Sequence, residues 1–379
     1  MAVEIRSFRF GDKLLKTFLK LPRQLYAGDP DWTPELIVER MDFHNPKKKP
    51  LRRQMDITYF LAYRNGQPVG RITAHSYPAH NATHDDKVGF FGFFESIDDK
   101  EVAGALFDAA AARCKEMGFD TMRGPVDFCT NEEVGSLVWA VRKEPAAVMM
   151  KYNPLYHQAL YEGAGFTRAK DLLAFEVTDD KWPNEKIQRI AGIARKKGAS
   201  LRQIRLDKKH WDEELAILND LYKRAWEKNW GFVPLNDEEF HHLAVEMKTI
   251  LDPRYTCIAE VDGKPVGWAL TLPDLHAILR HTDGGLLRTA WHMFIRKTQL
   301  KWDIIRRARI AILGIVPEYR KRGIEALFYE RNFEVSVNDV KIPRAEMSWI
   351  LEDNPEMVNG SKMMQGEHYK TYRLYDRAL

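Results

Sequence analysis

The chain has 379 residues, of which 45% are hydrophobic and 30% charged, with 58 Lys and Arg residues against 54 Asp and Glu residues. This length predicts two domains or one large one, and the composition excludes a disordered chain. Three scattered cysteines exclude a disulfide scaffold and a zinc ribbon, and they favour a reducing, intracellular setting. We expect no signal peptide and no membrane span. A net charge of +4 is too small to indicate a nucleic-acid partner.

The predicted elements of the first half alternate between strands and helices. The pattern predicts, in order, a strand (3–10), two helices (12–26, 34–41), a hairpin closed by Asn65-Gly66, a strand (87–95), a long helix (100–117), a strand (120–124), a further helix and a final strand (168–177). Asn-Gly between two apolar runs is typical of a type I′ hairpin turn. Strands and helices in this order indicate an α/β or α+β layer fold, a mixed sheet flanked by helices.

A connector with a basic helix (181–199) leads to a second half that reads the same way. Its predicted elements are a strand (201–206), two helices (211–229, 237–250), a hairpin closed by Asp262-Gly263, a strand (310–316), a helix (321–338), a strand (344–351), a helix and a last strand (370–376). We therefore predict two tandem domains, 1–180 and 200–379, joined by that connector.

Three pairs of matching segments indicate that one fold occurs twice. Gly70 and Gly267 each end a hairpin motif of the form Gly-x-Pro-Val-Gly, 197 residues apart. Ala-Leu-Phe recurs at 105–107 and 326–328, and Asn-Pro followed by Gly twelve residues after the Asn recurs from Asn153 and from Asn354. The pairs occur in the same order, so the shifts between them indicate an insertion at 273–309 in the second half and extra residues at 127–148 in the first.

The segment 312–328 carries the most informative motif. An apolar strand ends at Val316-Pro317, a short loop contains Arg320-Lys321-Arg322-Gly323, and an apolar-periodic helix follows. Glycine lets a ligand approach the backbone, a helix N-terminus offers free N–H groups, and Arg and Lys add positive charge. The pattern fits a pyrophosphate-type anion site, although an ordinary strand–loop–helix with a solvated basic turn fits it as well.

The run Val-Pro-Glu-Tyr-Arg-Lys-Arg-Gly-Ile (316–324) resembles the acyl-CoA pyrophosphate loop of the GNAT acyltransferase superfamily. Arg320 and Gly323 match its Q/R-x-x-G-x-G/A pattern, whereas Glu325 departs from it. The resemblance implies an acyl-CoA N-acyltransferase, with acyl-CoA as co-substrate. It also implies a set of CoA-binding residues, comprising the strand backbone at Leu313, Gly314, Ile315 and Val316 and the phosphate loop at Arg320, Lys321, Arg322, Gly323 and Ile324.

The first half has no such loop. Ile97-Asp98-Asp99-Lys100-Glu101 stands at the equivalent place, and its carboxylates would repel a pyrophosphate. We therefore expect the second half to bind acyl-CoA and the first to support or complete a substrate site.

Acyl transfer to an amine needs a neutral amine, a stabilised oxyanion and a departing thiolate. The general acid of GNAT enzymes is often a tyrosine before a Gly-Phe, and the resemblance implies that role for Tyr161 in the first half. The second half lacks the tyrosine and has Ser361 near that position, so the phosphate loop and the tyrosine lie in different halves. Candidate bases are carboxylates at strand ends, Glu95 in the first half and Glu352, followed by Asn354, in the second. Surface solvation or helix capping would equally explain the polar residues at 352–354.

Three histidines, His75, His80 and His84, lie near Pro78 and Asn81 with no carboxylate or cysteine pattern beside them. We interpret them as part of a surface loop and predict no metal site.

The insertion 273–309 holds eight Lys and Arg residues against three Asp, a net charge of +5. Its basic, aromatic, amphipathic pattern at 286–309 indicates either a membrane-surface helix or an arm that packs on another domain or subunit. Long GNAT-like chains of this layout resemble bacterial enzymes that N-acylate sphingoid bases. The resemblance implies an amphiphilic lipid amine as acceptor and a cytoplasmic enzyme with peripheral contact at the inner face of the membrane. The alternatives are an acetyltransferase for a small soluble amine, a catalytically degenerate acyl-CoA-binding module, and an aminoacyl transferase that uses charged tRNA.

Overall fold

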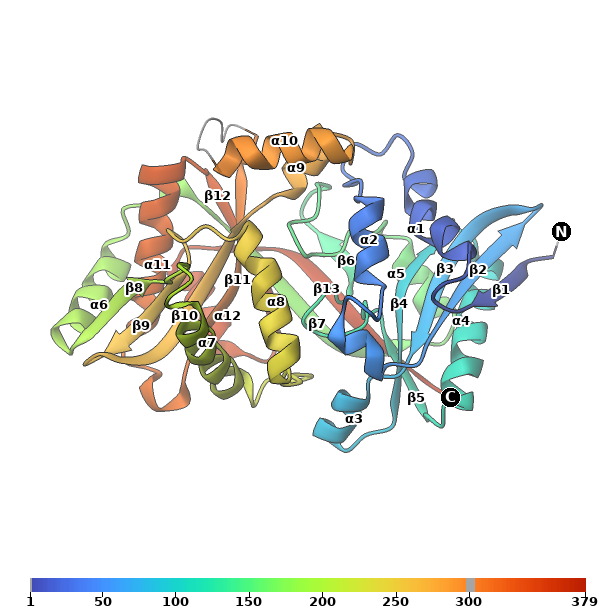
Figure 1. Ribbon diagram of the computed structural model, residues 1–379, viewed down its shortest axis with the longest axis horizontal. Helices are drawn as coiled ribbons and strands as arrows, with labels where there is room; N and C mark the ends of the chain where they lie inside the picture. The colour runs from blue at the N-terminus through green and yellow to red at the C-terminus, as the bar shows by residue number, and fades with distance from the viewer. Residues whose placement is uncertain (1, 298–303) are drawn as a thin grey trace. The chain divides into compact units, whose positions relative to one another are not determined.

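The computed structural model of the protein describes residues 2–297 and 304–379, which form two compact units. Unit 1 contains the residues up to Leu172 together with Thr282–Leu286 and Lys370–Leu379. Unit 2 contains Leu173–His281 and the described part of Leu287–Tyr369. Each unit is a mixed sheet with helices packed on it, as the sequence predicts (Figure 1).

The sheet of unit 1 places its longest buried strand near the centre. Its order is β1-β2-β3-β4-β5-β13, and β6 also pairs with β13. The strands are β1 (Glu4–Phe8), β2 (Ile57–Arg64), β3 (Gln67–His75), β4 (Val88–Ser96), β5 (Thr121–Gly124), β6 (Ser136–Ala140) and β13 (Glu367–Ala378). Only β4 and β5 pair in parallel among the registers of this sheet, over Val88–Phe90 and Thr121–Arg123. Every residue of β4 is buried.

Helices cover both faces of this sheet. They are α1 (Leu14–Leu25), α2 (Ile37–Phe43), α3 (Pro78–His84), α4 (Lys100–Glu116) and α5 (His157–Gly163), with a 3-10 turn at Pro50–Gln54. One hydrophobic cluster joins α4 to the sheet through Leu106, Phe107 and Phe91. A second joins α1 to the same strands through Phe18, Tyr59 and Phe93. Burial on both faces explains why β4 reads as a continuous apolar run rather than as an alternating one.

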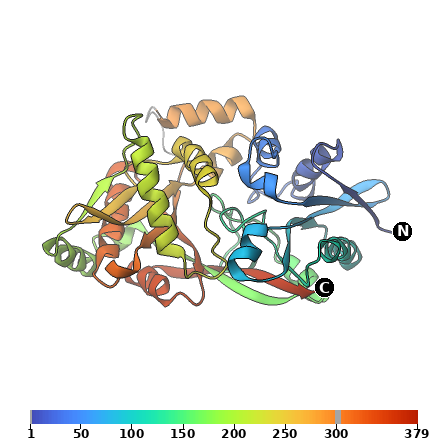
Figure 2. The same cartoon turned by 60° about the horizontal axis from the view of Figure 1, so that its bottom comes forward.

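The sheet of unit 2 has the order β7-β12-β11-β10-β9-β8. The strands are β7 (Thr167–Thr178), β8 (Ala199–Gln203), β9 (Cys257–Val261), β10 (Lys264–Pro273), β11 (Arg307–Ile315) and β12 (Arg344–Leu351). The helices are α6 (Glu185–Lys196), α7 (Trp211–Trp226), α8 (Asp237–Ile250), α9 (His276–His281), α10 (Leu286–Lys297), α11 (Ile324–Glu334) and α12 (Pro355–Met363). Helix α11 continues in a π-helical turn, Val335–Val340, and packs on α6, whereas α7 packs on β10 and β11 (Figure 2).

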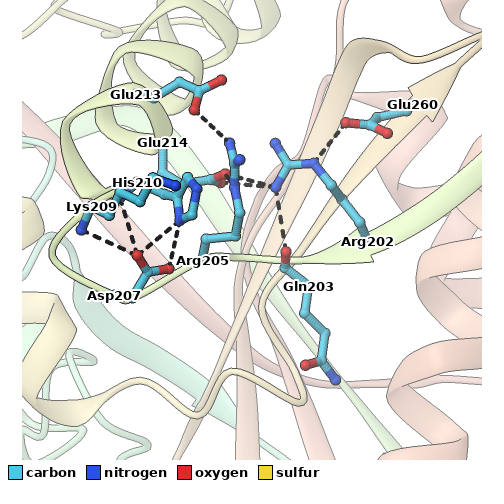
Figure 3. Close-up of polar contacts among 9 residues, drawn as sticks. All are labelled: Arg202, Gln203, Arg205, Asp207, Lys209, His210, Glu213, Glu214 and Glu260. Atoms are coloured by element: carbon cyan, nitrogen blue, oxygen red, sulfur yellow. Dashed lines mark hydrogen bonds and ion pairs between the residues drawn. The ribbon is translucent and has the colours of Figure 1, made fainter.

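A buried carboxylate fixes the start of α7. Glu214 is fully buried and accepts hydrogen bonds from Arg205 and from Arg202 Nη1 at 2.9 and 3.0 Å (Figure 3). Arg202 also donates to Glu260 of β9 at 2.6 Å, so one arginine ties α7 to the sheet. Charged groups are buried in this way when each has a partner.

The two hairpin turns confirm the I′ prediction. Both central residues of each turn have positive φ, 55° and 75° at Asn65-Gly66 and 51° and 77° at Asp262-Gly263. Left-handed conformation at both positions is what this turn requires.

The final strands of the two halves are exchanged between the units. Residues Leu173–Thr178 of β7 belong to unit 2, where β7 neighbours β12. Residues Lys370–Ala378 of β13 belong to unit 1, where Tyr375 pairs with Gly124 of β5. Each half of the chain therefore supplies the closing strand of the other unit, which the repeat pattern alone does not indicate.

The insertion contributes to both units. Residues 298–303 of the predicted basic arm lie outside the described residues. Thr282–Leu286 packs on unit 1, where Arg23 Nη1 lies 3.2 Å from the Asp283 carboxylate and Arg23 Nη2 donates to the Asp283 carbonyl at 2.8 Å. Gly284 and Leu286 line an open pocket of about 400 Å³ there with α1 and α2. The arm thus begins as a segment anchored to unit 1.

Candidate active site

Strands β11 and β12 separate along their length. Within the described residues, their parallel pairing runs only from Arg307↔Arg344 to Ile310↔Met347. Strand β11 continues to Ile315 and β12 to Leu351, so the edge of β11 that faces β12 has no ladder partner among the described residues from Ala311 onward. The predicted CoA-binding strand residues, Leu313–Ile315, lie in this stretch.

A basic loop connects the separated strand to α11. Val316 N donates to the Val266 carbonyl at 2.9 Å, Pro317–Tyr319 form a 3-10 turn, and Lys321 has a φ of 59°. Gly323 has a φ of 80° and precedes α11, and no side chain of the described residues 2–297 and 304–379 caps that helix. The first N–H groups of α11 are therefore left to the backbone and to whatever lies outside it.

The three cations of the loop are placed differently. Arg320 turns inward, and its guanidinium donates to the carbonyls of Ile315 (3.0 Å) and Ala225 (2.8 Å). Arg322 donates to the Glu318 carbonyl at 3.0 Å and lies 4.6 Å from the Tyr319 ring centroid. The Lys321 side chain is 85% exposed. Arg320 thus holds the loop in place, while Lys321 and Arg322 are on its surface, where Lys321 Nζ lies 4.0 Å from the Glu356 carboxylate.

The matching helix of unit 1 caps itself. The Asp99 carboxylate accepts hydrogen bonds from Glu101 N (2.9 Å) and Val102 N (3.1 Å), and Arg64 pairs with that carboxylate. A carboxylate of the chain thus occupies the place at which an anion would bind.

Unit 1 instead buries a trio of polar side chains beside β4. Tyr26, the residue after α1, donates a hydrogen bond to Glu95, and Arg71 Nη2 lies 3.9 Å from the other Glu95 oxygen. Arg71 also donates to the Phe18 carbonyl at 2.9 Å. Glu95 is 5% exposed, and burial raises the pKa of its carboxyl to about 7, although Arg71, Lys151 and Tyr26 oppose the shift. A carboxyl that titrates near neutral pH can accept and release a proton.

A buried ion pair supports this trio. Lys151 pairs with Asp127, whose other oxygen accepts a hydrogen bond from Phe93 N at 2.7 Å. Phe93 has a φ of 52°, and the β3–β4 register shifts beside it, between Arg71 and Thr73. The pair therefore holds the irregular part of β4 that precedes Glu95.

Strand register shows which residues of the two units correspond. Gly70 pairs with Ser96, and Gly267, its predicted repeat partner, pairs with Ile315. Counting one position along the paired strands, Arg71 faces Glu95 in unit 1, and Trp268 faces Gly314 in unit 2.

Tryptophans occupy the place of the polar trio in unit 2. A Cβ on Gly314 would lie 2.2 Å from the ring of Trp226, the last residue of α7, and the rings of Trp226 and Trp268 are 6.3 Å apart. Arg71, Glu95 and Tyr26 thus have Trp268, Gly314 and Trp226 as their counterparts. Unit 2 is apolar at the position where unit 1 carries an acid.

Three of the remaining predicted catalytic residues make contacts that stabilise the fold. Asn354 caps α12 by accepting a hydrogen bond from Met357 N at 3.1 Å, and Ser361, 2% exposed, donates to the Met357 carbonyl at 3.0 Å. Tyr161 lies in the core of unit 1, where its ring stacks on Tyr375 at 4.8 Å. Glu352 follows β12 and is partly exposed.

Sequence reasoning missed Tyr26 and Arg71. An arginine within the apolar strand 67–75 is the signal that could have found the second, since a buried charge needs a partner. It also missed a buried cluster on β11 and β12. There Arg309 Nε donates to Ser348 Oγ at 3.0 Å, and the Glu346 carboxylate accepts hydrogen bonds from Ser348 Oγ at 2.5 Å and from Tyr369.

The surface-loop prediction was wrong for His75 and His80, whereas His84 is exposed at the end of α3. His75 ends β3 and is fully buried, and His80, 2% exposed, lies in α3 with Asp86 3.2 Å away. Burial lowers the pKa of His75 to about 3 and that of His80 to about 4. Both rings pack against Phe90 of β4, with centroids 6.0 Å away for His75 and 4.9 Å away for His80. Across 2–297 and 304–379 no cluster of three His, Cys, Asp or Glu side chains is arranged to hold a metal ion.

Comparisons with known proteins agree with this architecture. No protein-family model matches the chain. Among solved structures, a tandem GNAT protein from the clavulanic acid biosynthesis pathway is 12% identical, covers 99% of this chain and 98% of its own, and superposes with a TM-score of 0.58. A GCN5-related N-acetyltransferase from Sphaerobacter thermophilus is 11% identical, with coverage of 99% and 95% and a TM-score of 0.51. The fold is that of the tandem GNAT proteins, as predicted.

Two curated relatives align over nearly the whole chain. The bacterial ceramide synthase of Caulobacter vibrioides (strain NA1000 / CB15N) is 33% identical over 372 residues, which are 96% of this chain and 95% of the relative. Protein YghO of Escherichia coli (strain K12) is 32% identical over 369 residues, 96% of this chain and 93% of the relative. The protein is thus an N-acyltransferase of the GNAT type. Within that class, it belongs to the family of the bacterial ceramide synthase.

Proposed function

We propose that the protein transfers an acyl group from an acyl-CoA thioester to the amino group of an amphiphilic lipid, such as a sphingoid base. The observation that carries the acyl-CoA part is the end of β11. In the described part of the chain, an edge without a ladder partner leads into a cationic loop and a helix N-terminus that no side chain caps. The name of the Caulobacter relative supports the lipid acceptor.

The proposed CoA site divides its contacts between strand and loop. The backbone of Leu313–Ile315 would hydrogen-bond the pantetheine arm, because its edge lies where β11 leaves β12, whereas Val316 N already donates to the Val266 carbonyl. The N–H groups from Gly323 onward and the charges of Lys321 and Arg322 would bind the phosphates. Arg320 acts indirectly, since its guanidinium is engaged by two backbone carbonyls.

Glu95 is the residue we assign to proton transfer. A lipid amine is protonated at neutral pH, so one N–H proton must leave before the nitrogen can attack the thioester carbonyl. Glu95 is the buried carboxyl of unit 1 whose pKa of about 7 suits that exchange. The new C–N bond then forms as the C–S bond breaks, the nitrogen loses its second proton, and that loss balances the proton taken up by the CoA thiolate on release. Glu352 is the weaker candidate, because it is partly exposed.

Titration of CoA into the protein tests the loop assignment. Lys321→Glu/Arg322→Glu should weaken CoA binding at least tenfold, since two phosphate-directed charges are reversed. Lys208→Glu/Lys209→Glu makes the same charge change just before the first residue of α7. Arg320 of the loop contacts the last turn of that helix, which is about 24 Å long at 1.5 Å per residue. This control variant should bind CoA like the wild type. Equal affinity of the loop variant and the wild type would refute the assignment.

The acceptor is tested separately by thiol release. Release of CoA with a sphingoid base and a long-chain thioester supports the lipid acceptor. Release with small amines and acetyl-CoA alone would favour the soluble acetyltransferase. Saturable CoA binding with no release from any pair would favour a degenerate binding module.

A further inference from the structure

Helix α10 carries large apolar side chains on its solvent face, opposite the side that packs on unit 2. Thr289 is buried, and Met293, one turn later, packs against the core cluster of Ile278, Ile305 and Val335. The opposite face carries Leu287, Trp291 and Phe294, which are 84%, 61% and 55% exposed. A surface helix normally turns its apolar stripe inward. Here large apolar side chains face outward.

These three residues form one continuous strip. Spacings of four and three residues place them on the same face of a helix. The rings of Trp291 and Phe294 stack with centroids 6.0 Å apart. We call Leu287, Trp291 and Phe294 the α10 strip. Exposed apolar groups in such an array commonly mark a binding surface.

The charge of the helix sequence indicates what the strip meets. The twelve residues of α10 include three Arg and Lys residues and no Asp or Glu. Arg288 is exposed beside Leu287. Two copies of the helix packed on each other would bring like charges together, because a twofold interface joins identical patches. A surface of lipid phosphates would neutralise the same charges.

We propose that the α10 strip docks on an anionic lipid bilayer, with Leu287, Trp291 and Phe294 in the headgroup layer and the exposed Arg288 near lipid phosphates. Tryptophan, phenylalanine and leucine opposite a buried face, on a helix with an excess of Arg and Lys, are the composition of an interfacial helix. None of the helices in the described part of the chain is long and apolar enough to cross a membrane. The biological role of this docking rests on the proposed function, because a bilayer is where an amphiphilic amine would be found.

Vesicle sedimentation with the full chain tests the proposal. Wild-type protein should pellet with vesicles of phosphatidylcholine containing about 30% phosphatidylglycerol, and much less with phosphatidylcholine alone. Raising the salt should release it, since the Debye length falls from about 10 Å at 0.1 M to about 3 Å at 1 M. Leu287→Glu/Trp291→Glu should reduce the bound fraction about tenfold or more, because it places carboxylates in the headgroup layer.

Two control substitutions separate this effect from a general loss of surface hydrophobicity. Ile193→Glu on α6 and Val245→Glu on α8 each add a carboxylate at an exposed apolar residue elsewhere on unit 2, 47% and 44% exposed. Both should pellet like the wild type. Equal recovery of wild-type protein in the supernatant with and without anionic vesicles would overturn the proposal. So would a wild-type dimer in lipid-free sedimentation velocity that the α10 double variant dissociates.

A further measurement distinguishes failure of this inference from failure of the proposed function. CoA release with a short-chain thioester and a water-soluble amine should be the same in the α10 double variant and the wild type. Loss of vesicle binding with unchanged release supports bilayer docking. Vesicle binding by a wild-type protein that releases no CoA from any thioester would refute the function and leave the docking surface standing.

Discussion

Glu95 of β4 and Gly314 of β11 hold the same position in the two units. Each precedes by one residue the partner of a repeat glycine, Gly70 or Gly267, in the neighbouring strand. The acid lies in the unit whose helix α4 is capped by Asp99, and the glycine lies in the unit with the basic loop. The two copies therefore differ at equivalent positions: one carries a buried acid and a helix capped by its own carboxylate, and the other carries a glycine and a basic loop before its helix.

Replacing Glu95 by Gln should remove the proton acceptor. Because the carboxyl has a pKa of about 7 and acts when ionised, wild-type kcat/KM should rise with pH through that value. The variant should lose this rising limb of the pH profile, and its rate at pH 8 should be lower by about 10²-fold or more. Thiol release measured from about two pH units below that pKa to about two above it follows both effects. A variant that keeps the limb would show that another group takes the proton.

Tyr26→Phe should move the same limb to higher pH. The Tyr26 hydroxyl donates to the Glu95 carboxylate, and a hydrogen bond to the charged form lowers the pKa. Tyr152→Phe is the matched control, since its ring lies 5.6 Å from Tyr26 while its hydroxyl donates to Asp29. The control should leave the limb in place. Identical pH profiles for both variants would contradict the pairing of Tyr26 with Glu95.

Gly314→Ala should destabilise unit 2. The added Cβ would lie 2.2 Å from the Trp226 ring, and forced overpacking typically costs about 1–3 kcal/mol. Gly104→Ala, in α4, is the control: apart from the backbone of its own helix, no atom lies within 4 Å of the added methyl group, and alanine is favoured in helices by about 0.5–1 kcal/mol. The urea midpoint of unfolding should thus fall for Gly314→Ala and rise for Gly104→Ala. Trp226→Leu should relieve the first effect.

Glu214→Ala should destabilise the protein by about 2 kcal/mol. The loss of stability is smaller than for a fully buried ion pair, because both arginines keep some solvent contact. Glu213→Ala removes the neighbouring acid, which is 62% exposed and pairs with Arg205 at 3.1 Å (Figure 3). That change should cost no more than about 0.5 kcal/mol. Similar unfolding midpoints for the two variants would contradict the anchoring role of Glu214.

Local signals in the sequence were sufficient for most elements. Asn65-Gly66 and Asp262-Gly263 specify their turns by backbone preference alone, and α8 begins where the capping box of Asn236 and Glu239 places it. These features need only neighbouring residues. The repeat followed from three short matches, whereas the domain limits 1–180 and 200–379 stay a prediction.

Features that depend on residues distant in the sequence could not be predicted. The exchange of β7 and β13 is decided by sheet pairing, to which both final strands are equally suited in sequence. Tyr26 and Trp226 act through residues about 70 and 90 positions away, Glu95 and Gly314, that only strand register brings to them. The predicted roles of Ser361 and Asn354 came from motif position, and hydrogen bonds within α12 explain those residues as well.

The most direct test of the account is formation of an amide. Purified protein is incubated with a long-chain acyl-CoA and a sphingoid base, and mass spectrometry follows the product while a thiol reagent follows CoA. The account predicts one N-acylated base for each CoA released, with Lys321→Glu/Arg322→Glu strongly impaired and Lys208→Glu/Lys209→Glu fully active. Release of CoA without an amide, or equal product from both double variants, would contradict it.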